Sequence, residues 1–207
     1  MLKTALVLGA TGLVGKALVE QLCRDRRYQT VTCLVRKPLS NDFFTENASK
    51  VRPIVVNFEN LQDYQGYFGA QHIFVCLGTT IKKAGNKSSL RRVDFEYVHV
   101  AAQVARAQPA LSTVWISSSG ANAQRSNFYL RVKGELENAI INMSGLDNAC
   151  AVRPSLLLGK REEMRPTEKL ATMLTPLLSP LMLGGFSKYK PVQVADVAAQ
   201  MIRLQVF

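Results

Sequence analysis

Residues that hold metals or build disulfide frameworks are scarce in this sequence. Its 207 residues include 4 cysteines and 2 histidines. The cysteines form no C-x-x-C pair, and neither histidine stands at ligand spacing from them, which argues against a structural zinc site and a disulfide scaffold. A chain of this length buries enough surface to fold without cross-links. We therefore expect the cysteines to be reduced and buried.

The sequence also lacks an uninterrupted apolar run long enough to cross a membrane. The longest candidate, 170–186, contains Pro176 and Pro180, whereas a spanning helix needs about 20 apolar residues. The apolar stretch after Lys3 has the outline of a secretory signal peptide, but glycines recur in it at fixed spacing and Lys16 interrupts it. We therefore expect a soluble, cytoplasmic protein with no transmembrane segment.

Acidic residues are few, with 15 Asp and Glu against 26 Lys and Arg, a net charge of +11. Such an excess favours a polyanionic partner, which includes nucleic acid, an acidic membrane and a phosphorylated small molecule. The basic residues come in short groups without regular aromatic interleaving, so nucleic-acid binding is not predicted as the main function. The composition is that of a globular protein, and the length predicts one domain over residues 1–207.

Short apolar segments alternate with amphipathic ones along most of the chain. Six segments have the length and the Val, Ile, Leu and Cys content of strands buried on both faces, at 5–8, 31–35, 54–56, 73–77, 113–117 and 149–152. Amphipathic stretches predict helices at 16–24, 90–107, 127–143 and 194–204. The alternation predicts an α/β fold with a doubly wound parallel sheet, the Rossmann fold.

The alternation stops after Arg153, where proline and glycine gather. Residues 156–190 are irregular and contain many Leu and Met residues. This small C-terminal segment is expected to be a lid or substrate wall that favours an apolar part of the substrate. The alternative is a packed cap over the sheet.

A glycine-rich turn follows the first predicted strand and leads into a helix. Glycines at intervals of three permit the tight turn, the approach of backbone N–H groups to a pyrophosphate, and close packing of helix and strand. The sequence therefore predicts a dinucleotide site, and the residues assigned to it are Gly9, Thr11, Gly12, Leu13, Val14 and Gly15.

No carboxylate ends the second predicted strand, where a dinucleotide fold normally holds the adenosine ribose with Asp or Glu. Arg36 and Lys37 stand there instead. A guanidinium pairs with a 2′-phosphate that a carboxylate would repel, so the predicted cofactor is NADP(H). Asn57, after the third strand, is expected to flank the adenine.

The fourth predicted strand ends in small and hydroxyl residues, at the edge where open α/β sheets bind ligands. We assign cofactor contacts to Leu77, Gly78, Thr79 and Thr80. The preceding Cys76 lies in the apolar strand with no adjacent basic residue, so it is interpreted as a packing residue.

The fifth predicted strand ends in a serine cluster, and a tyrosine and a lysine follow on the next helix. Tyr129 and Lys133 are four residues apart, so they share one helical face. A fixed ammonium favours the phenolate form of the tyrosine, which makes Tyr129 a usable proton donor. Ser118 or Ser119 would hold the substrate oxygen, and Lys133 would also reach the nicotinamide ribose.

Together these residues resemble the short-chain dehydrogenase/reductase superfamily, with its G-x-x-G-x-x-G turn, serine and Y-x-x-x-K motif. Further segments are similar to the atypical branch of the Tat-interacting protein oxidoreductases, namely 76–80, 83–85, 92–97, 126–137 and 153–154. The likeness runs from about residue 4 to the end. The resemblance implies NADPH binding, an oxidoreductase activity and a cofactor contact at Arg153.

The residues and the resemblance predict an NADPH-dependent oxidoreductase that reduces a carbonyl group of an unidentified small molecule. Tyr129 is expected to be the proton donor, and Lys133 with Ser118 or Ser119 completes the catalytic set. The alternative is an NADPH-binding regulatory protein that acts through protein partners without turnover. A homo-oligomer is compatible with either hypothesis.

Overall fold

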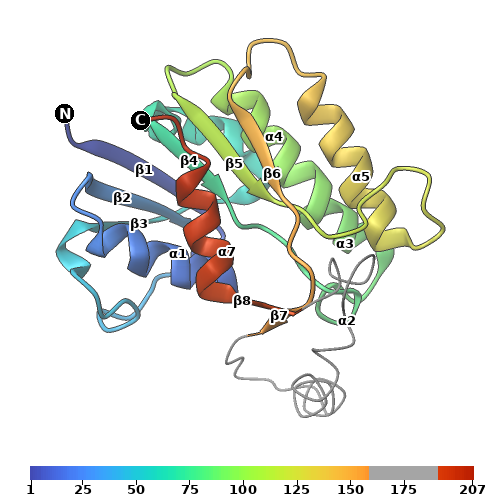
Figure 1. The fold of residues 1–207 in the computed structure, drawn as a ribbon, viewed down its shortest axis with the longest axis horizontal. Coiled ribbons are helices and arrows are strands. Elements are labelled where there is room, and N and C mark those ends of the chain that lie inside the picture. Colours follow the sequence, from blue (N-terminus) through green and yellow to red (C-terminus); the bar gives the residue numbers. More distant parts are fainter. Residues whose placement is uncertain (159–190) are drawn as a thin grey trace.

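Six parallel strands form the central sheet of the computed structural model, which describes residues 1–158 and 191–207 (Figure 1). They are β1 (Lys3–Leu8), β2 (Tyr28–Val35), β3 (Val51–Val55), β4 (His72–Val75), β5 (Ser112–Ile116) and β6 (Ala149–Val152), in the order β3-β2-β1-β4-β5-β6. This is the predicted doubly wound sheet, with the order that gives a binding crevice where it reverses between β1 and β4.

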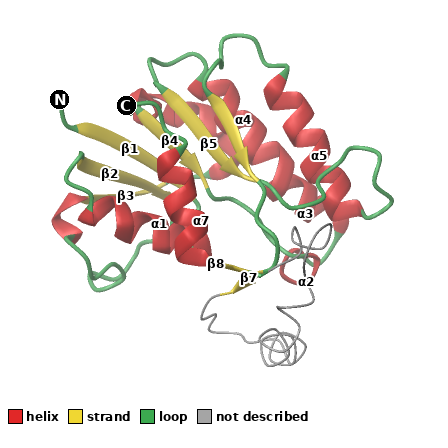
Figure 2. Ribbon diagram, in the orientation of Figure 1, coloured by secondary structure: helices red, strands yellow, loops and turns green. Residues whose placement is uncertain are grey.

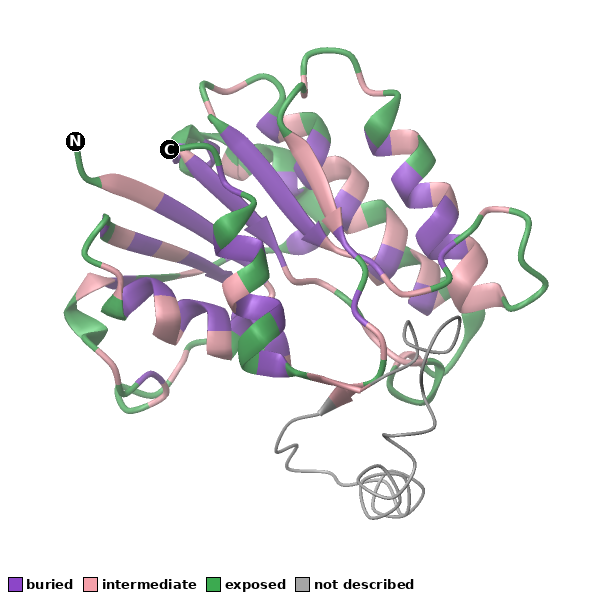
Figure 3. Cartoon of the chain, viewed as in Figure 1, coloured by how far each residue is buried: buried purple, intermediate pink, exposed green. Residues whose placement is uncertain are grey.

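Helices cover both faces of the sheet (Figure 2). One face packs against α1 (Leu13–Arg24) and α7 (Val194–Arg203), and the other against the 3₁₀ segment η2 (Phe58–Gly69), α4 (Tyr97–Ala105) and α5 (Phe128–Ile141). Successive side chains of a strand point to opposite faces, so both sets must be apolar. In β1, Ala5 and Val7 join the first core, and Leu6 and Leu8 join the second. The central strands β1, β4 and β5 are accordingly mostly buried (Figure 3). At the edge of the sheet, β3 is exposed at Arg52, Pro53 and Val55.

The helix predicted at 90–107 is in fact three pieces. The structure has α3 (Lys87–Arg91), a π-helical turn η3 (Arg92–Glu96) and α4. Leu90, Asp94 and Val98 are all buried at intervals of four, and such spacing fits a turn wider than 3.6 residues. The short segments η1 (Ala48–Lys50), η2 and α2 (Ile81–Ala84) were not predicted.

The predicted lid or substrate wall, 156–190, lies outside the described residues from 159 onward. Its first described part is β7 (Leu157–Leu158), which pairs in parallel with β8 (Val192–Gln193) before α7. Within 1–158 and 191–207, every helix is too short or too polar to cross a membrane.

Candidate functional site

The glycine turn between β1 and α1 forms a tight cradle at the carboxyl edge of the sheet. Gly9 has a φ of +85°, and a Cβ there would lie 2.6 Å from the carbonyl oxygen of Cys76. A Cβ on Gly15 would lie 2.1 Å from the carbonyl oxygen of Gly9. Helix α1 therefore reaches its position against the strand ends only because glycine occupies both places.

Helix α1 begins directly after Gly12, which has no side chain to cap it. The first N–H groups of a helix lack intrahelical acceptors, and the helix dipole makes this end positive. Thr11 and Gly12 are exposed and Leu13 is half-buried, so a ligand can approach this end. The glycine cradle and the uncapped helix end fit the pyrophosphate of a dinucleotide.

A cleft of about 480 Å³ lies at the carboxyl ends of β2 and β3. Strand β2 pairs with β1, the strand that leads into the glycine turn. Its lining residues are Arg36, Val55, Val56, Asn57, Phe58, Glu59, Tyr64 and Tyr97. Arg36 and Lys37 are exposed where the sequence predicted them, directly after β2. Asn57 has another role besides lining the cleft, since its Oδ1 accepts the Glu59 N–H at 3.0 Å and caps η2. An adenine would have to share that acceptor or use the Asn57 amide N–H.

Three polar residues in and beside this cleft received no role from the sequence, namely Glu59, Arg92 and Tyr97. The Tyr97 hydroxyl donates a hydrogen bond to Glu59 Oε1, and Arg92 Nη1 lies 3.5 Å from the same oxygen. Burial and the Glu59 carboxylate raise the pKa of Tyr97 to about 12. Tyr97 therefore remains a neutral hydrogen-bond donor throughout the physiological pH range.

The predicted reaction end of the site, with Lys133 and Tyr129, lies at the carboxyl ends of β4 and β5. Lys133 of α5 is 1% exposed, and its Nζ lies 2.8 Å from Oδ1 of Asp94, which is 0% exposed. Lys133 Nζ also donates to the Ile116 carbonyl oxygen at 3.2 Å. Tyr129, half-buried one turn earlier on α5, has its ring centroid 6.0 Å from the same Nζ. The structure thus brings the predicted tyrosine and lysine together.

Gly78 lies directly over this ion pair. A Cβ on Gly78 would lie 3.3 Å from Asp94 Oδ1 and 3.8 Å from Lys133 Nζ. The Thr79 N–H donates to Asp94 Oδ2 at 2.8 Å. Thr80 has its hydroxyl oxygen engaged as the cap of α2, where it accepts the Lys83 N–H at 3.3 Å. The predicted segment Leu77–Thr80 therefore forms the floor between the cradle and the lysine.

The serines directly follow Ile116, the residue of β5 whose carbonyl oxygen accepts the Lys133 hydrogen bond. Ser118 and Ser119 are half-buried, and the Ser118 hydroxyl makes one long contact of 3.5 Å with the Ser119 carbonyl oxygen. Ser117, which the sequence left unassigned, is 1% exposed. Its Oγ has no hydrogen-bond partner among residues 1–158 and 191–207. Both predicted serines stay candidates for holding a substrate oxygen.

Two other predicted positions have clear structural surroundings. Arg153, after β6, forms an ion pair with Glu137 of α5 and is 55% exposed. The charge available to a cofactor at Arg153 is therefore partly compensated. Burial raises the pKa of the Cys76 thiol to about 12, which is the property of a packing cysteine rather than a nucleophile.

Asp94 is a further site residue that sequence reasoning missed. It stood in a segment used for the resemblance but received no role. The sequence feature that could have revealed it is its position midway between Leu90 and Val98, four residues from each of these buried apolar residues. A carboxylate at such a position is expected to be buried and therefore paired.

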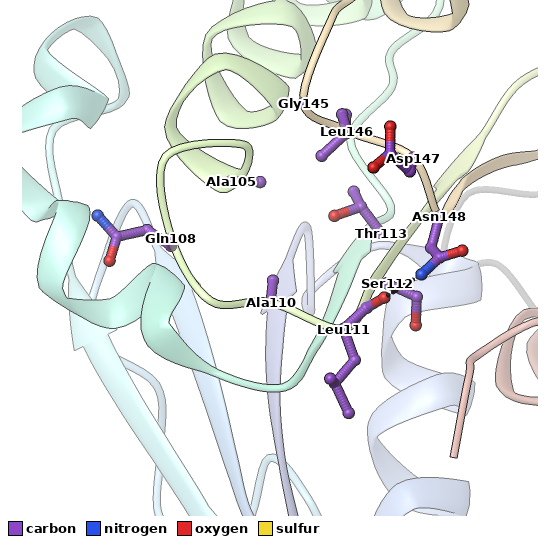
Figure 4. A pocket seen from close by; sticks show the side chains of 10 residues that line it. All are labelled: Ala105, Gln108, Ala110, Leu111, Ser112, Thr113, Gly145, Leu146, Asp147 and Asn148. Atoms are coloured by element: carbon purple, nitrogen blue, oxygen red, sulfur yellow. Dashed lines mark hydrogen bonds between the residues drawn. The ribbon is translucent and has the colours of Figure 1, made fainter.

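A second, smaller cavity of about 120 Å³ lies at the opposite edge of the sheet, where β5 begins (Figure 4). Its lining comes from the end of α4, the start of β5 and the loop before β6, and includes Ala105, Ser112, Thr113 and Asn148. None of the predicted site residues lines this cavity. It is therefore separate from the candidate cofactor site.

Comparison with known proteins agrees with this geometry. The profile of a family described as NAD(P)H-binding matches residues 9–204. Protein HTATIP2 of Rattus norvegicus is 37% identical over 201 residues, covering 97% of this chain and 80% of its own. The structure of the PhqB reductase domain of Penicillium fellutanum superposes with a TM-score of 0.70 at 16% identity. The match covers 99% of this chain and 64% of that one, so it spans less than two thirds of that protein and shows the fold alone.

The prediction of a plain cytoplasmic location is wrong. Protein FMP52-1 of Scheffersomyces stipitis, 33% identical over 164 residues with 77% of this chain and 69% of its own covered, is named as mitochondrial. Other yeast relatives carry the same designation. The prediction rested on glycine spacing and on interrupted apolar runs, which argue against secretion and membrane spanning but do not distinguish the cytosol from an organelle.

The prediction of a dinucleotide-binding Rossmann fold is confirmed by the sheet order, the glycine cradle and these relatives. With the family profile matched over residues 9–204 and 37% identity to Protein HTATIP2, the chain belongs to the NAD(P)H-binding family, in the branch that its motifs resembled.

Proposed function

We propose that the protein is an NADPH-dependent oxidoreductase that reduces a carbonyl group of a small molecule. The observation that carries the proposal is the placement of Tyr129 and the buried Lys133 on one face of α5, at the strand ends next to the glycine cradle. A binding protein needs the cradle. It does not need a phenol and an ammonium aimed at the same edge of the sheet.

The residues of this chain divide the work of holding the cofactor. The N–H groups at the start of α1 bind the pyrophosphate, and Arg36 pairs with the adenosine 2′-phosphate. The cleft beside Asn57 takes the adenine. Lys133, below Gly78, reaches a hydroxyl of the nicotinamide ribose. The preference for NADPH over NADH rests on Arg36, which stands where a carboxylate would select the unphosphorylated ribose.

When bound, NADPH supplies a hydride to the carbonyl carbon. Tyr129 donates its phenolic proton to the carbonyl oxygen, so that the substrate becomes an alcohol and the phenol regains its proton from solvent. Ser118 or Ser119 donates a hydrogen bond to the same oxygen. The Lys133 ammonium, held in its ion pair with Asp94, lies near the Tyr129 ring and stabilises the transient phenolate.

The test is steady-state NADPH oxidation against a panel of aldehydes and ketones, run beside a fluorescence titration of NADPH and NADH. We expect tighter binding of NADPH and turnover of at least one carbonyl compound. Binding of NADPH with no turnover on any compound would contradict the proposal and favour a regulator that acts through protein partners. Equal affinity for NADPH and NADH would show that Arg36 does not select the phosphorylated cofactor.

A further inference from the structure

Asp94 is a buried carboxylate at a place where the fold would ordinarily put an apolar side chain. It lies in η3 between the buried Leu90 and Val98, and it is 0% exposed. An unpaired charge in a protein interior is strongly destabilising. Its partner at 2.8 Å is Lys133, which is equally buried. The two residues therefore depend on each other for their place in the core.

The π-helical turn explains how Asp94 reaches this position. In η3 the Tyr97 N–H donates to the carbonyl oxygen of Arg92, five residues back. The wider turn keeps Leu90, Asp94 and Val98 in register on one side although they are four residues apart. That side faces the sheet and α5, and it directs the carboxylate beneath the end of β4.

The carboxylate joins two elements that meet the cofactor. Oδ2 accepts the Thr79 N–H at 2.8 Å. Oδ1 pairs with Lys133 Nζ and lies where a Cβ on Gly78 would approach to 3.3 Å. One side chain therefore fixes both the floor of the cleft, at Gly78 and Thr79, and the lysine of α5.

We propose that Asp94 is a positioning residue that holds Lys133 and the Gly78–Thr79 floor as one unit and compensates the charge of Lys133. Tyr129 then experiences the field of a fixed ion pair instead of that of a bare ammonium. The inference rests on the proposed function only for its catalytic meaning, because the pairing itself is testable without turnover.

Other charged groups lie on α5 and on the elements packed against it. These elements contribute Lys87 and Arg91 from α3, Arg92 and the exposed Glu96 from η3, His99 from α4 and Arg153 after β6, and α5 itself carries Arg131, Glu135 and Glu137. Arg91 pairs with Glu135 and Arg153 with Glu137. Asp94 is thus the carboxylate that decides the net charge next to Lys133.

The first experiment is a double-mutant cycle on cofactor-free protein, with Asp94→Asn, Lys133→Met and the combined variant. Each single change leaves one buried charge without its partner, so we expect the Tm to fall by roughly 10 °C. The combined variant has a neutral pair and should recover at least half of that loss. Glu96→Gln, which removes an exposed carboxylate from the same turn, should leave the Tm unchanged. Additive losses, or a combined variant that does not fold, would overturn the pairing.

The second experiment separates positioning from a merely structural role. Tyrosinate absorbance is recorded against pH for the wild type and for Asp94→Asn. The absorbance of the same protein carrying Tyr129→Phe is subtracted from each, so that the difference reports Tyr129. Asparagine keeps an acceptor for the Thr79 N–H but leaves the Lys133 ammonium uncompensated. The Tyr129 signal should therefore appear at a lower pH in Asp94→Asn than in the wild type. An unchanged profile beside a lowered Tm would make Asp94 a structural residue only and overturn the proposal.

The two proposals fail in different ways. If the wild type binds NADPH but reduces no carbonyl, the proposed function fails while the cycle and the absorbance profile still decide the role of Asp94. If the carbonyl panel is turned over and the cycle shows no coupling, the function stands and the inference about Asp94 is wrong.

Discussion

The two ends of the candidate cofactor site hold their charges in opposite ways. At the reaction end, Lys133 and Asp94 are 1% and 0% exposed and lie 2.8 Å apart. At the proposed adenosine end, which is the cleft at the ends of β2 and β3, Arg92 and Glu59 are 51% and 53% exposed and lie 3.5 Å apart, and Arg36 is also exposed. Water screens the exposed pair, which contributes little to stability, whereas the buried pair cannot lose one member without a large penalty.

This difference separates a preorganised end from an adaptable one. The proposed reaction end is fixed by packing of α5, η3 and the end of β4, and such fixed placement is what hydride transfer would require. Under the proposed function, the adenosine end would bind a part of the cofactor that undergoes no chemistry. Exposed side chains that change rotamer freely are sufficient there, because the bound ligand would order them. Substitutions at the two ends should therefore affect different quantities.

Removal of the Tyr129 hydroxyl should have the largest effect on turnover and almost none on binding. Tyr129→Phe keeps the ring on α5 but has no proton to donate, so kcat for a carbonyl substrate should fall by about 10²–10⁴-fold. The dissociation constant of NADPH, from a fluorescence titration, should stay within about twofold, because Tyr129 is assigned no cofactor contact. Unchanged kcat would show that another group supplies the proton.

The glycine cradle is proposed to hold the pyrophosphate, which NADPH and NADH have in common. Its loss should therefore weaken the binding of both cofactors equally. Gly15→Ala forces a Cβ to within 2.1 Å of the Gly9 carbonyl oxygen, and relief requires α1 to move. We expect a loss of about 3 kcal/mol in the free energy of unfolding and parallel weakening of NADPH and NADH binding. Gly66→Ala is the matched control, since nothing lies within 4 Å of its Cβ. Selective weakening of one cofactor would contradict this role.

Arg36 should affect only the phosphorylated cofactor. Arg36→Ala removes a charge-assisted hydrogen bond worth about 1.5–2 kcal/mol, so the dissociation constant of NADPH should rise roughly 10–30-fold. NADH binding should not change. Arg52→Ala removes another exposed arginine at the opposite end of β3 and controls for net charge. If Arg52→Ala weakens NADPH as much, the effect of Arg36 is one of overall charge.

Most of the fold could be predicted because its determinants are local in the sequence. Strands buried on both faces, such as β1 and β4, read as continuous apolar segments, and the glycine turn has a spacing that only a strand-to-helix connection requires. The Tyr129 and Lys133 pair was accessible for the same reason, since i,i+4 spacing fixes a shared helical face before tertiary structure is known.

The unpredicted parts depend on contacts between distant segments. The partner of Lys133 is Asp94, 39 positions earlier in the chain, and the two meet only because η3 and α5 pack against each other. A π-helical turn has no marked composition of its own, so the segment around Asp94 was interpreted as a continuous helix. The cap at Asn57 was missed likewise, because η2 is a 3₁₀ segment with weak periodicity.

Ionic strength should produce the smallest effect and should distinguish the two ends without any substitution. The Debye length falls from about 10 Å at 0.1 M salt to about 3 Å at 1 M, so the attraction between the exposed Arg36 and a 2′-phosphate is screened. Over that range we expect NADPH binding to weaken a few-fold more than NADH binding, as measured by titration at each salt concentration. The coupling between Asp94 and Lys133 in the double-mutant cycle should stay the same, because water and ions do not reach that pair. Equal salt dependence of NADPH and NADH binding would mean that the 2′-phosphate does not contact Arg36. A coupling energy that disappears at 1 M salt would mean that the Lys133–Asp94 pair is open to solvent.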